Sequence, residues 1–202
     1  MDFYHDLITQ ESWQVLQSLR SKFNFILIGG WAVFLYTHAL KSKDIDLVLD
    51  YKDLEKVKKE FTLTKNDRLK KYEARNEEIQ IDIYVPFYSN PGLPAEDLKQ
   101  FVANIEGFSS IEKEVLALLK QKALIERAHS SKGRKDLIDL VSLFMLDDFD
   151  FAKYRKIASG YKLAEYMKKT HDLLKTTSSL MELDLNEHKM ARLKKSILPK
   201  LL

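Results

Sequence analysis

The sequence contains no cysteine. This absence excludes disulfide bonds, zinc sites built from thiolates and cysteine nucleophiles. The chain also lacks an apolar run long enough to span a bilayer, and its first residues lack the basic and apolar segments of a signal peptide. We therefore expect a cytoplasmic protein with no membrane partner.

A large excess of charge is missing too, since the net charge is only +3. The charge is unevenly placed, however. Residues 151–202 carry 12 Lys and Arg against 5 Asp and Glu, a net charge of +7, so the remainder carries −4. A basic C-terminal part suggests a polyanionic partner, and a lysine-rich helical surface that is merely solvated is the simpler alternative.

The segment from Phe23 to Asp50 organises the first half of the chain. An apolar run stops at Gly29-Gly30, which is typical of a buried strand that ends in a tight turn. Trp31–Leu40 is apolar and rich in helix formers, so we expect a short helix packed on a sheet. Asp44–Leu49 has the pattern of a second strand, which is expected to point Ile45 and Leu47 into the core.

Two carboxylates, Asp44 and Asp46, share the other face of that strand, because side chains two apart in a strand point the same way. Neighbouring carboxylates repel each other, and the usual remedy is a divalent cation, commonly Mg²⁺ where phosphates are handled. The Gly29-Gly30 pair lets backbone N–H groups approach an anion at the start of a helix. The combination predicts phosphoryl or nucleotidyl transfer.

A third carboxylate follows in the segment Glu78–Pro86. Isoleucines alternate there with polar residues, a clean period of two, and Asp82 lies on the face opposite the isoleucines. Aspartate is disfavoured inside a β-branched strand, so its presence needs a reason. If this strand lies beside the one that carries Asp46, Asp82 joins the other two carboxylates.

The ordered set of Gly-Gly, Asp-x-Asp on a following strand and a single Asp on a later strand resembles the DNA polymerase β-like nucleotidyltransferase superfamily. The resemblance covers Phe23 to Pro86. It implies that an NMP is transferred from an NTP to an acceptor hydroxyl, with release of pyrophosphate. It also implies two Mg²⁺ ions, with Mn²⁺ as a substitute. The implied metal ligands are Asp44, Asp46 and Asp82, and the implied nucleotide contacts are Gly29, Gly30 and Lys43.

The second half carries another resemblance. Leu116–Arg127 places Leu116, Lys120, Ala123 and Arg127 at helical spacing, and Asp136 opens the next helix. This pairing is similar to later motifs of the AbiEii-type nucleotidyltransferases, which include toxins of type IV toxin–antitoxin systems. The resemblance implies that Lys120 neutralises triphosphate charge and that Asp136 orients the lysine. A solvated Lys120 and an N-cap role for Asp136 are the plain alternatives.

The predicted fold is α/β (α+β), with a small mixed β-sheet nucleotidyltransferase domain over 1–108, flanked by helices. A C-terminal α-helical bundle follows over 109–202. Within the first domain we expect a loop over 65–74 and a last strand over 101–105, and Ser109 or Ser110 is expected to cap the first helix of the bundle. The predicted helices of the bundle are 111–129, 135–146, 151–158, 162–176 and 187–197.

Three functions stay open at this point. The first is a nucleotidyltransferase whose acceptor is RNA, tRNA or protein, with a cognate antitoxin as a further partner. The second is the same chemistry on a small molecule of the aminoglycoside kind. The third is a catalytically silent nucleotide-binding or antitoxin-partner module. A deep acidic cleft beside the site favours a cationic small molecule, and a basic groove favours RNA.

Overall fold

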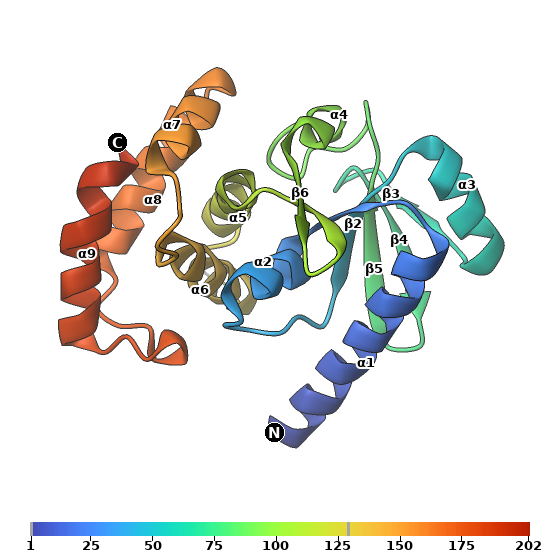
Figure 1. Ribbon diagram of the computed structural model, residues 1–202, viewed down its shortest axis with the longest axis horizontal. Helices are drawn as coiled ribbons and strands as arrows, with labels where there is room; N and C mark the ends of the chain where they lie inside the picture. Colours follow the sequence, from blue (N-terminus) through green and yellow to red (C-terminus); the bar gives the residue numbers. More distant parts are fainter. Residues whose placement is uncertain (1, 129) are drawn as a thin grey trace. The chain divides into compact units, whose positions relative to one another are not determined.

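The computed structural model describes residues 2–128 and 130–202, with side chains from Leu7 onward. The chain divides into two compact units, Met1–Glu112 and Lys113–Leu202, which we call the sheet unit and the helical unit. Figure 1 shows the strands of the first and the helices of the second. The predicted fold class, a mixed α/β domain followed by a helical region, is confirmed.

A seven-stranded mixed sheet forms the centre of the sheet unit, in the order β3-β4-β5-β2-β1-β7-β6. The pairs β1–β7 and β2–β5 are parallel, and the other neighbouring pairs are antiparallel. The strands are β1 (Ile26–Ile28), β2 (Ile45–Val48), β3 (Thr64–Asn66), β4 (Lys71–Asn76), β5 (Ile79–Tyr84), β6 (Val102–Ile105) and β7 (Phe108–Ile111).

Alternation along β2 and β5 divides their side chains between the two faces of the sheet. Ile79, Ile81 and Ile83 of β5 are buried, and so are Ile45 and Leu47 of β2. Paired residues of neighbouring strands share a face, and the register joins Ile45 to Ile81 and Leu47 to Ile83. One face is therefore a continuous aliphatic core, as the period of two predicted.

Helices of the sheet unit pack against its central strands. Their bounds are α1 (Asp2–Lys22), α2 (Gly29–Thr37), α3 (Tyr51–Glu60) and α4 (Ala95–Leu98), followed by the 3-10 turn η1 (Lys99–Phe101). Helix α1 contacts β5, and α2 contacts β1 and β2. The buried Trp31 of α2 donates a hydrogen bond through Nε1 to the Ser12 hydroxyl of α1, at 2.8 Å, so the core joins the two helices.

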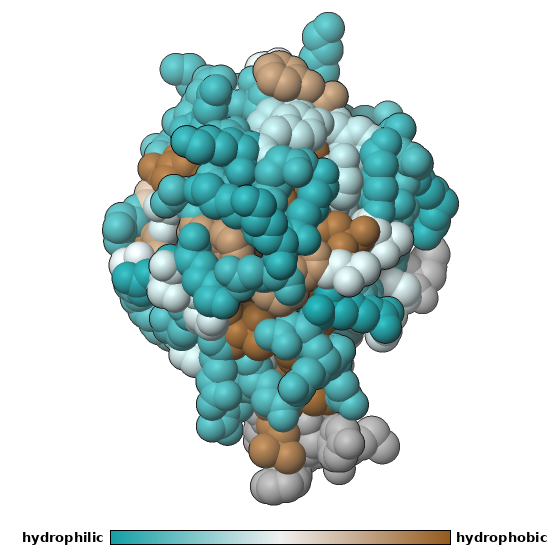
Figure 2. Space-filling view, turned by 90° about the vertical axis from the view of Figure 1, so that its right-hand side faces the viewer, coloured by the Kyte–Doolittle hydropathy of each residue, from teal (hydrophilic) through white to brown (hydrophobic). Residues whose placement is uncertain are grey.

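Helix α3 is amphipathic: Asp53, Leu54 and Val57 are buried, and its other charged residues are exposed. Figure 2 looks at the molecule from the side where α3 lies in Figure 1, and this face is mainly hydrophilic with small, scattered apolar areas. No helix in the described residues is both long enough and apolar enough to cross a membrane.

Three sequence-based predictions in the sheet unit are wrong. The expected loop over 65–74 is occupied by β3 and β4. The expected tight turn at Gly29-Gly30 is the first turn of α2, with Ile28 as its N-cap. The expected helix cap at Ser109 or Ser110 lies in β7, where the buried Ser110 hydroxyl donates to the Leu27 carbonyl of β1 at 3.2 Å. Because β7 belongs to the sheet, the division between units follows Glu112, whereas the sequence predicted it after residue 108.

The helical unit consists of helices joined by short loops. They are α5 (Lys113–Glu126), α6 (Ser131–Phe144), α7 (Phe151–Gly160), α8 (Ala164–Thr176) and α9 (Glu187–Leu201), with the 3-10 turn η2 (Met181–Leu183) before α9. Helix α5 packs against α6, α7 and α8. Side chains cap three of these helices at their N-termini: Ser130 for α6, Asp150 for α7 and Asn186 for α9. Asp136 is therefore not an N-cap.

Candidate active site

Asp46 lies at the centre of the sheet, where β2 is flanked by β1 and β5. The register places it between Ile28, the last residue of β1, and Asp82 of β5. Directly paired residues point to the same face, so Asp46 and Asp82 are neighbours on the face opposite the aliphatic core. The predicted adjacency of their two strands is confirmed. Asp44 lies just before β2 and is half-buried, as is Asp46.

Gly29 is packed against the Asp46 carboxylate. Its φ is +69°, in the left-handed region, and a Cβ added there would lie 2.0 Å from Oδ2 of Asp46. Only glycine fits this position, because any side chain would displace the carboxylate. Gly29 and Gly30 begin α2, and the N-cap Ile28 offers no side-chain acceptor to its first N–H groups. The N-terminus of α2 is thus suited to an anion beside Asp46.

Asp82 is engaged on both carboxylate oxygens. Lys71 Nζ lies 2.5 Å from its Oδ2, and Gln80 Nε2 donates to its Oδ1 at 2.8 Å. Lys71 also lies 3.1 Å from Oε1 of Glu73, which accepts a hydrogen bond from Asn66. This polar row follows one face of the sheet from β2 across β5 and β4 to β3.

Burial alone would lower the pKa of Lys71, but its hydrogen bonds and charge interactions with Asp82 and Glu73 outweigh burial and raise the pKa above the usual value of 10.5. The same interaction shifts the pKa of Glu73 in the opposite direction. Burial favours its neutral form, yet hydrogen bonds from Lys71 and Asn66 lower its pKa. Lys71 is therefore a fixed cation beside two carboxylates.

The fit of this row to the implied pair of metal ions is partial. Asp44 and Asp46 supply the hard oxygen donors that Mg²⁺ prefers. Asp82 already holds an ammonium group against Oδ2, in the place that a cation bound to it would take. In the described residues, no group of three or more His, Cys, Asp or Glu is arranged to hold a metal ion. The donor chemistry of Asp44 and Asp46 suits a divalent ion, whereas Asp82, with Lys71 against it, does not fit a second.

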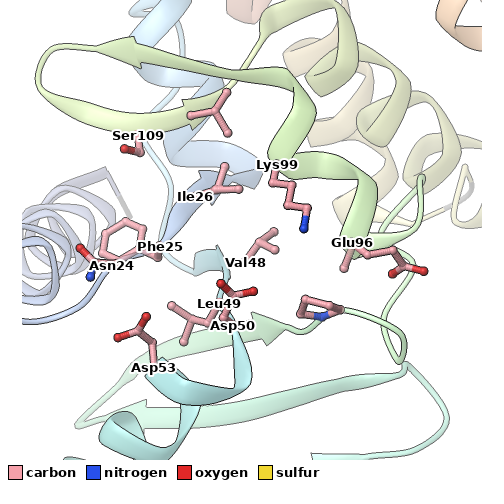
Figure 3. A pocket seen from close by; sticks show the side chains of 13 residues that line it. Asn24, Phe25, Ile26, Val48, Leu49, Asp50, Asp53, Glu96, Lys99 and Ser109 are labelled. Carbon is pink, nitrogen blue, oxygen red and sulfur yellow. The ribbon is translucent and has the colours of Figure 1, made fainter.

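A pocket of about 210 Å³ opens at the other end of β1 and β2. Its floor includes Ile26 and Val48, which are paired with each other and lie two residues along from Ile28 and Asp46. The pocket therefore shares a sheet face with Asp46. Figure 3 shows charged side chains around it, and these are Asp50, Asp53, Glu96 and Lys99.

Lys120 and Asp136 lie together inside the helical unit. Lys120 is 8% exposed and its Nζ lies 3.4 Å from Oδ1 of Asp136, but only 2.7 Å from Oδ2 of Asp139. Arg127 Nε donates to Oδ2 of Asp136 at 2.6 Å. Lys120 is therefore not a solvated surface lysine. Of the two aspartates, Asp139 is the nearer to Lys120, and Asp136 also accepts from Arg127.

The partners of these candidate residues were not predicted from the sequence. Lys71 and Glu73 fell in a predicted loop, although the alternation from Lys71 to Asn76 is itself a strand pattern. Asp139 follows Asp136 at a spacing of three, which puts both on one helix face towards Lys120. Lys43, the remaining predicted nucleotide contact, is half-buried in the segment between α2 and β2.

No protein-family model matches the chain, and no curated protein matches it. Solved structures do match. JHP933 from Helicobacter pylori aligns over 96% of this chain and 93% of its own, with a TM-score of 0.53 and 20% identity. A "putative nucleotidyltransferase" from H. pylori aligns over 96% of this chain and 95% of its own, with a TM-score of 0.53 and 18% identity.

The chain shares its fold with these two H. pylori proteins. At these identities the likeness concerns the fold over nearly the full length of the chain, including the helical unit. Activity and substrates have to be argued from the residues themselves.

Proposed function

We propose that the protein is a nucleotidyltransferase that moves an NMP from an NTP to an acceptor hydroxyl. The observation that carries this proposal is the position of Asp46, which lies against Gly29 at the N-terminus of α2 and beside Asp82 in register. A phosphate site and two carboxylates on one sheet face are the parts that phosphoryl chemistry requires.

The residues of the chain have distinct roles in this proposal. The backbone N–H groups of Gly29 and Gly30 bind the β- and γ-phosphates, and Lys43 adds a positive charge nearby. Asp44 and Asp46 hold a Mg²⁺ ion, for which Mn²⁺ can substitute, and that ion neutralises triphosphate charge when bound. The acceptor oxygen bonds to the α-phosphorus, the bond to pyrophosphate breaks, and the hydroxyl proton passes to a carboxylate of the row or to water.

The proposed acceptor is RNA, such as tRNA, or a protein. The excess of basic residues over 151–202 supports a polyanionic acceptor, and Lys156, Lys168 and Lys195 are among its exposed lysines. Lys194 has a structural role, since Nζ donates to the carbonyls of Lys175 and Thr177 at the end of α8, at 3.1 and 2.9 Å. Kinship with AbiEii-type enzymes, and with it a toxin role and an antitoxin partner, is inferred from Lys120 and Asp136 alone.

A cationic small molecule is the second candidate acceptor. The pocket on the same sheet face as Asp46 has three carboxylates, Asp50, Asp53 and Glu96, and one lysine, Lys99. Its net charge is therefore negative, which favours a ligand with amino groups. The apolar floor at Ile26 and Val48 suits the ring of such a ligand.

The decisive experiment offers each of the four NTPs, labelled at the α-phosphate, with Mg²⁺ and one acceptor class at a time. The classes are total RNA, cell protein and a panel of aminoglycosides. We expect label on RNA, and RNA binding that weakens steeply as salt rises, because bound counterions are released. Label on an aminoglycoside would select the second candidate instead.

Asp46→Asn tests the site in the same assay. Its side chain lies on the polar face, so the fold is expected to persist, and transfer should fall on the order of 10²-fold or more, since an amide is a poor metal ligand. The matched control is Asp67→Asn, an exposed aspartate in the turn after β3, which should retain full transfer. Equal transfer by the Asp46 and Asp67 variants would refute the site. NTP binding without transfer would leave the silent nucleotide-binding module, and absence of both would leave the antitoxin-partner module.

A further inference from the structure

Lys71 is a buried lysine in the middle of the polar row. It is 7% exposed, and its ammonium nitrogen lies 2.5 Å from Asp82 and 3.1 Å from Glu73. Buried lysines are rare, because removing an ammonium group from water is costly unless partners compensate. Here two carboxylates compensate.

The backbone register explains why a cation is needed at this place. Glu73 and Asp82 are direct cross-strand partners, and like charges opposite each other destabilise a pair of strands. Lys71 precedes Glu73 by two residues on β4 and shares its face, so the ammonium group reaches both carboxylates. Gln80 and Asn66 supply the remaining hydrogen bonds.

The ion pair between Lys71 and Asp82 lies next to the proposed active site. Asp82 is paired with Asp46 across β5 and β2, and Asp46 packs against Gly29. The partner of Lys71 is therefore the direct neighbour of Asp46. A divalent cation bound to Asp82 would have to share Oδ2 with an ammonium group 2.5 Å away, and the two cations would repel each other.

We propose that Lys71 takes the place of a divalent cation at Asp82. The protein then binds a single metal ion, at Asp44 and Asp46. Lys71 is a positioning residue: it holds Asp82 in its orientation next to Asp46 and neutralises the charge of that side of the site. The role of Lys71 in the site rests on the proposed function. The number of bound metal ions can be measured whether or not the protein transfers nucleotides.

The test counts bound Mn²⁺ per chain by electron paramagnetic resonance, with a non-hydrolysable NTP analogue present. The wild type should bind one Mn²⁺. Lys71→Met removes the ammonium group at nearly constant length, which leaves Asp82 and Glu73 without a cation, so this variant should bind two. It should also melt at a lower temperature than the wild type in EDTA, and added Mn²⁺ should recover much of that loss.

Two variants control the measurement. Lys71→Arg keeps the positive charge and should bind one Mn²⁺. Lys65→Met removes a half-exposed lysine on the neighbouring strand β3, 2.9 Å from Asp67, and should also bind one Mn²⁺ and melt like the wild type. If Lys71→Met does not fold, Lys71→Met combined with Glu73→Gln carries one negative charge fewer and takes its place.

The outcomes separate the two proposals. Two Mn²⁺ in the wild type would overturn the inference and leave nucleotidyl transfer intact. No gain of Mn²⁺ in the Lys71→Met variant, or in its Glu73→Gln combination, would overturn it as well and reduce Lys71 to a structural ion pair. If Lys71→Met binds one Mn²⁺ more than the wild type, but the wild type transfers no nucleotide, the inference would be supported and the proposed function refuted.

Discussion

Each of the two units buries a lysine between two carboxylates. In the sheet unit, Lys71 lies between Glu73 and Asp82. In the helical unit, Lys120 lies between Asp136 and Asp139. The local chemistry is the same, yet the carboxylates of the helical group are the more deeply buried.

In the helical group, Arg127 supplies a second cation to Asp136, and Lys135 Nζ lies 3.9 Å from Oδ2 of Asp139. In the sheet group, Lys71 contacts Glu73 and Asp82, whose side chains are 28% and 11% exposed, and Asp46 is the next carboxylate in register. Carboxylates that keep contact with solvent are more accessible to a ligand than carboxylates sealed among helices. A charge network that is sealed from solvent therefore stabilises the fold, whereas one that reaches solvent can also serve as a site.

The largest expected effect on stability is that of Lys120→Met. It leaves two carboxylates, which are 2% and 1% exposed, short of a cation, so the free energy of unfolding should fall by about 3–5 kcal/mol. Urea unfolding measures this change. Lys122→Met, on the more exposed side of α5, should change it by less than about 0.5 kcal/mol.

Activity per folded molecule then decides the role of Lys120. The triple variant Lys120→Met, Asp136→Asn and Asp139→Asn also removes the two carboxylate charges. It should recover much of the free energy of unfolding that Lys120→Met loses. If it also recovers transfer, Lys120 is structural. A Lys120→Met variant that is as stable as the wild type but inactive would break the comparison and support the role implied by the AbiEii resemblance.

Gly29→Ala should have the next largest effect. The added Cβ would displace the Asp46 carboxylate and strain a left-handed backbone, at a cost of about 1–3 kcal/mol, and NTP affinity should fall with it. Calorimetry of unfolding and of NTP binding measures both. Gly160→Ala, at the end of α7, is the control: its Cβ would meet nothing within 4 Å, so both quantities should stay near wild type. Unchanged NTP affinity in the Gly29 variant would show that Gly29 does not contribute to nucleotide binding.

The smallest expected effect concerns an exposed ion pair of the helical unit. Arg134 donates to both carboxylate oxygens of Glu182, at 3.0 and 2.9 Å, and these hydrogen bonds hold the pKa of Glu182 below its usual 4.5. The lowered pKa means that the pair stabilises the fold above about pH 4.5, and that this contribution is lost as pH falls through the lowered pKa. Both side chains are more than a third exposed, so the contribution should be less than about 1 kcal/mol.

Unfolding of the wild type and of Glu182→Gln, compared between pH 7 and pH 3, measures that contribution. The difference in stability between them should shrink towards acid pH. If Glu182→Gln lowers the free energy of unfolding at pH 7 as much as Lys120→Met does, solvent exposure does not determine how much an ion pair contributes to stability.

Local pattern was sufficient to predict the central strands and most helices. The alternation of isoleucines in β5, and of Ile45 and Leu47 in β2, produces buried faces in any packed sheet, because the side-chain period of a strand is two. The order of Gly-Gly, Asp46 and Asp82 along the chain likewise determined which residues meet at the sheet centre once those strands paired.

The surroundings of those residues depend on how distant segments pack. That Lys71 neutralises Asp82, and that Asp139 rather than Asp136 lies closest to Lys120, depends on the register between strands and on the pairing of two helices. A charged residue carries no local sign of its partner: Lys71 resembles a loop lysine until β4 pairs with β5 and buries it. The central strands and their carboxylates followed from the sequence, but the free energy of a buried charge depends on groups that are distant in sequence, so their partners followed from the fold.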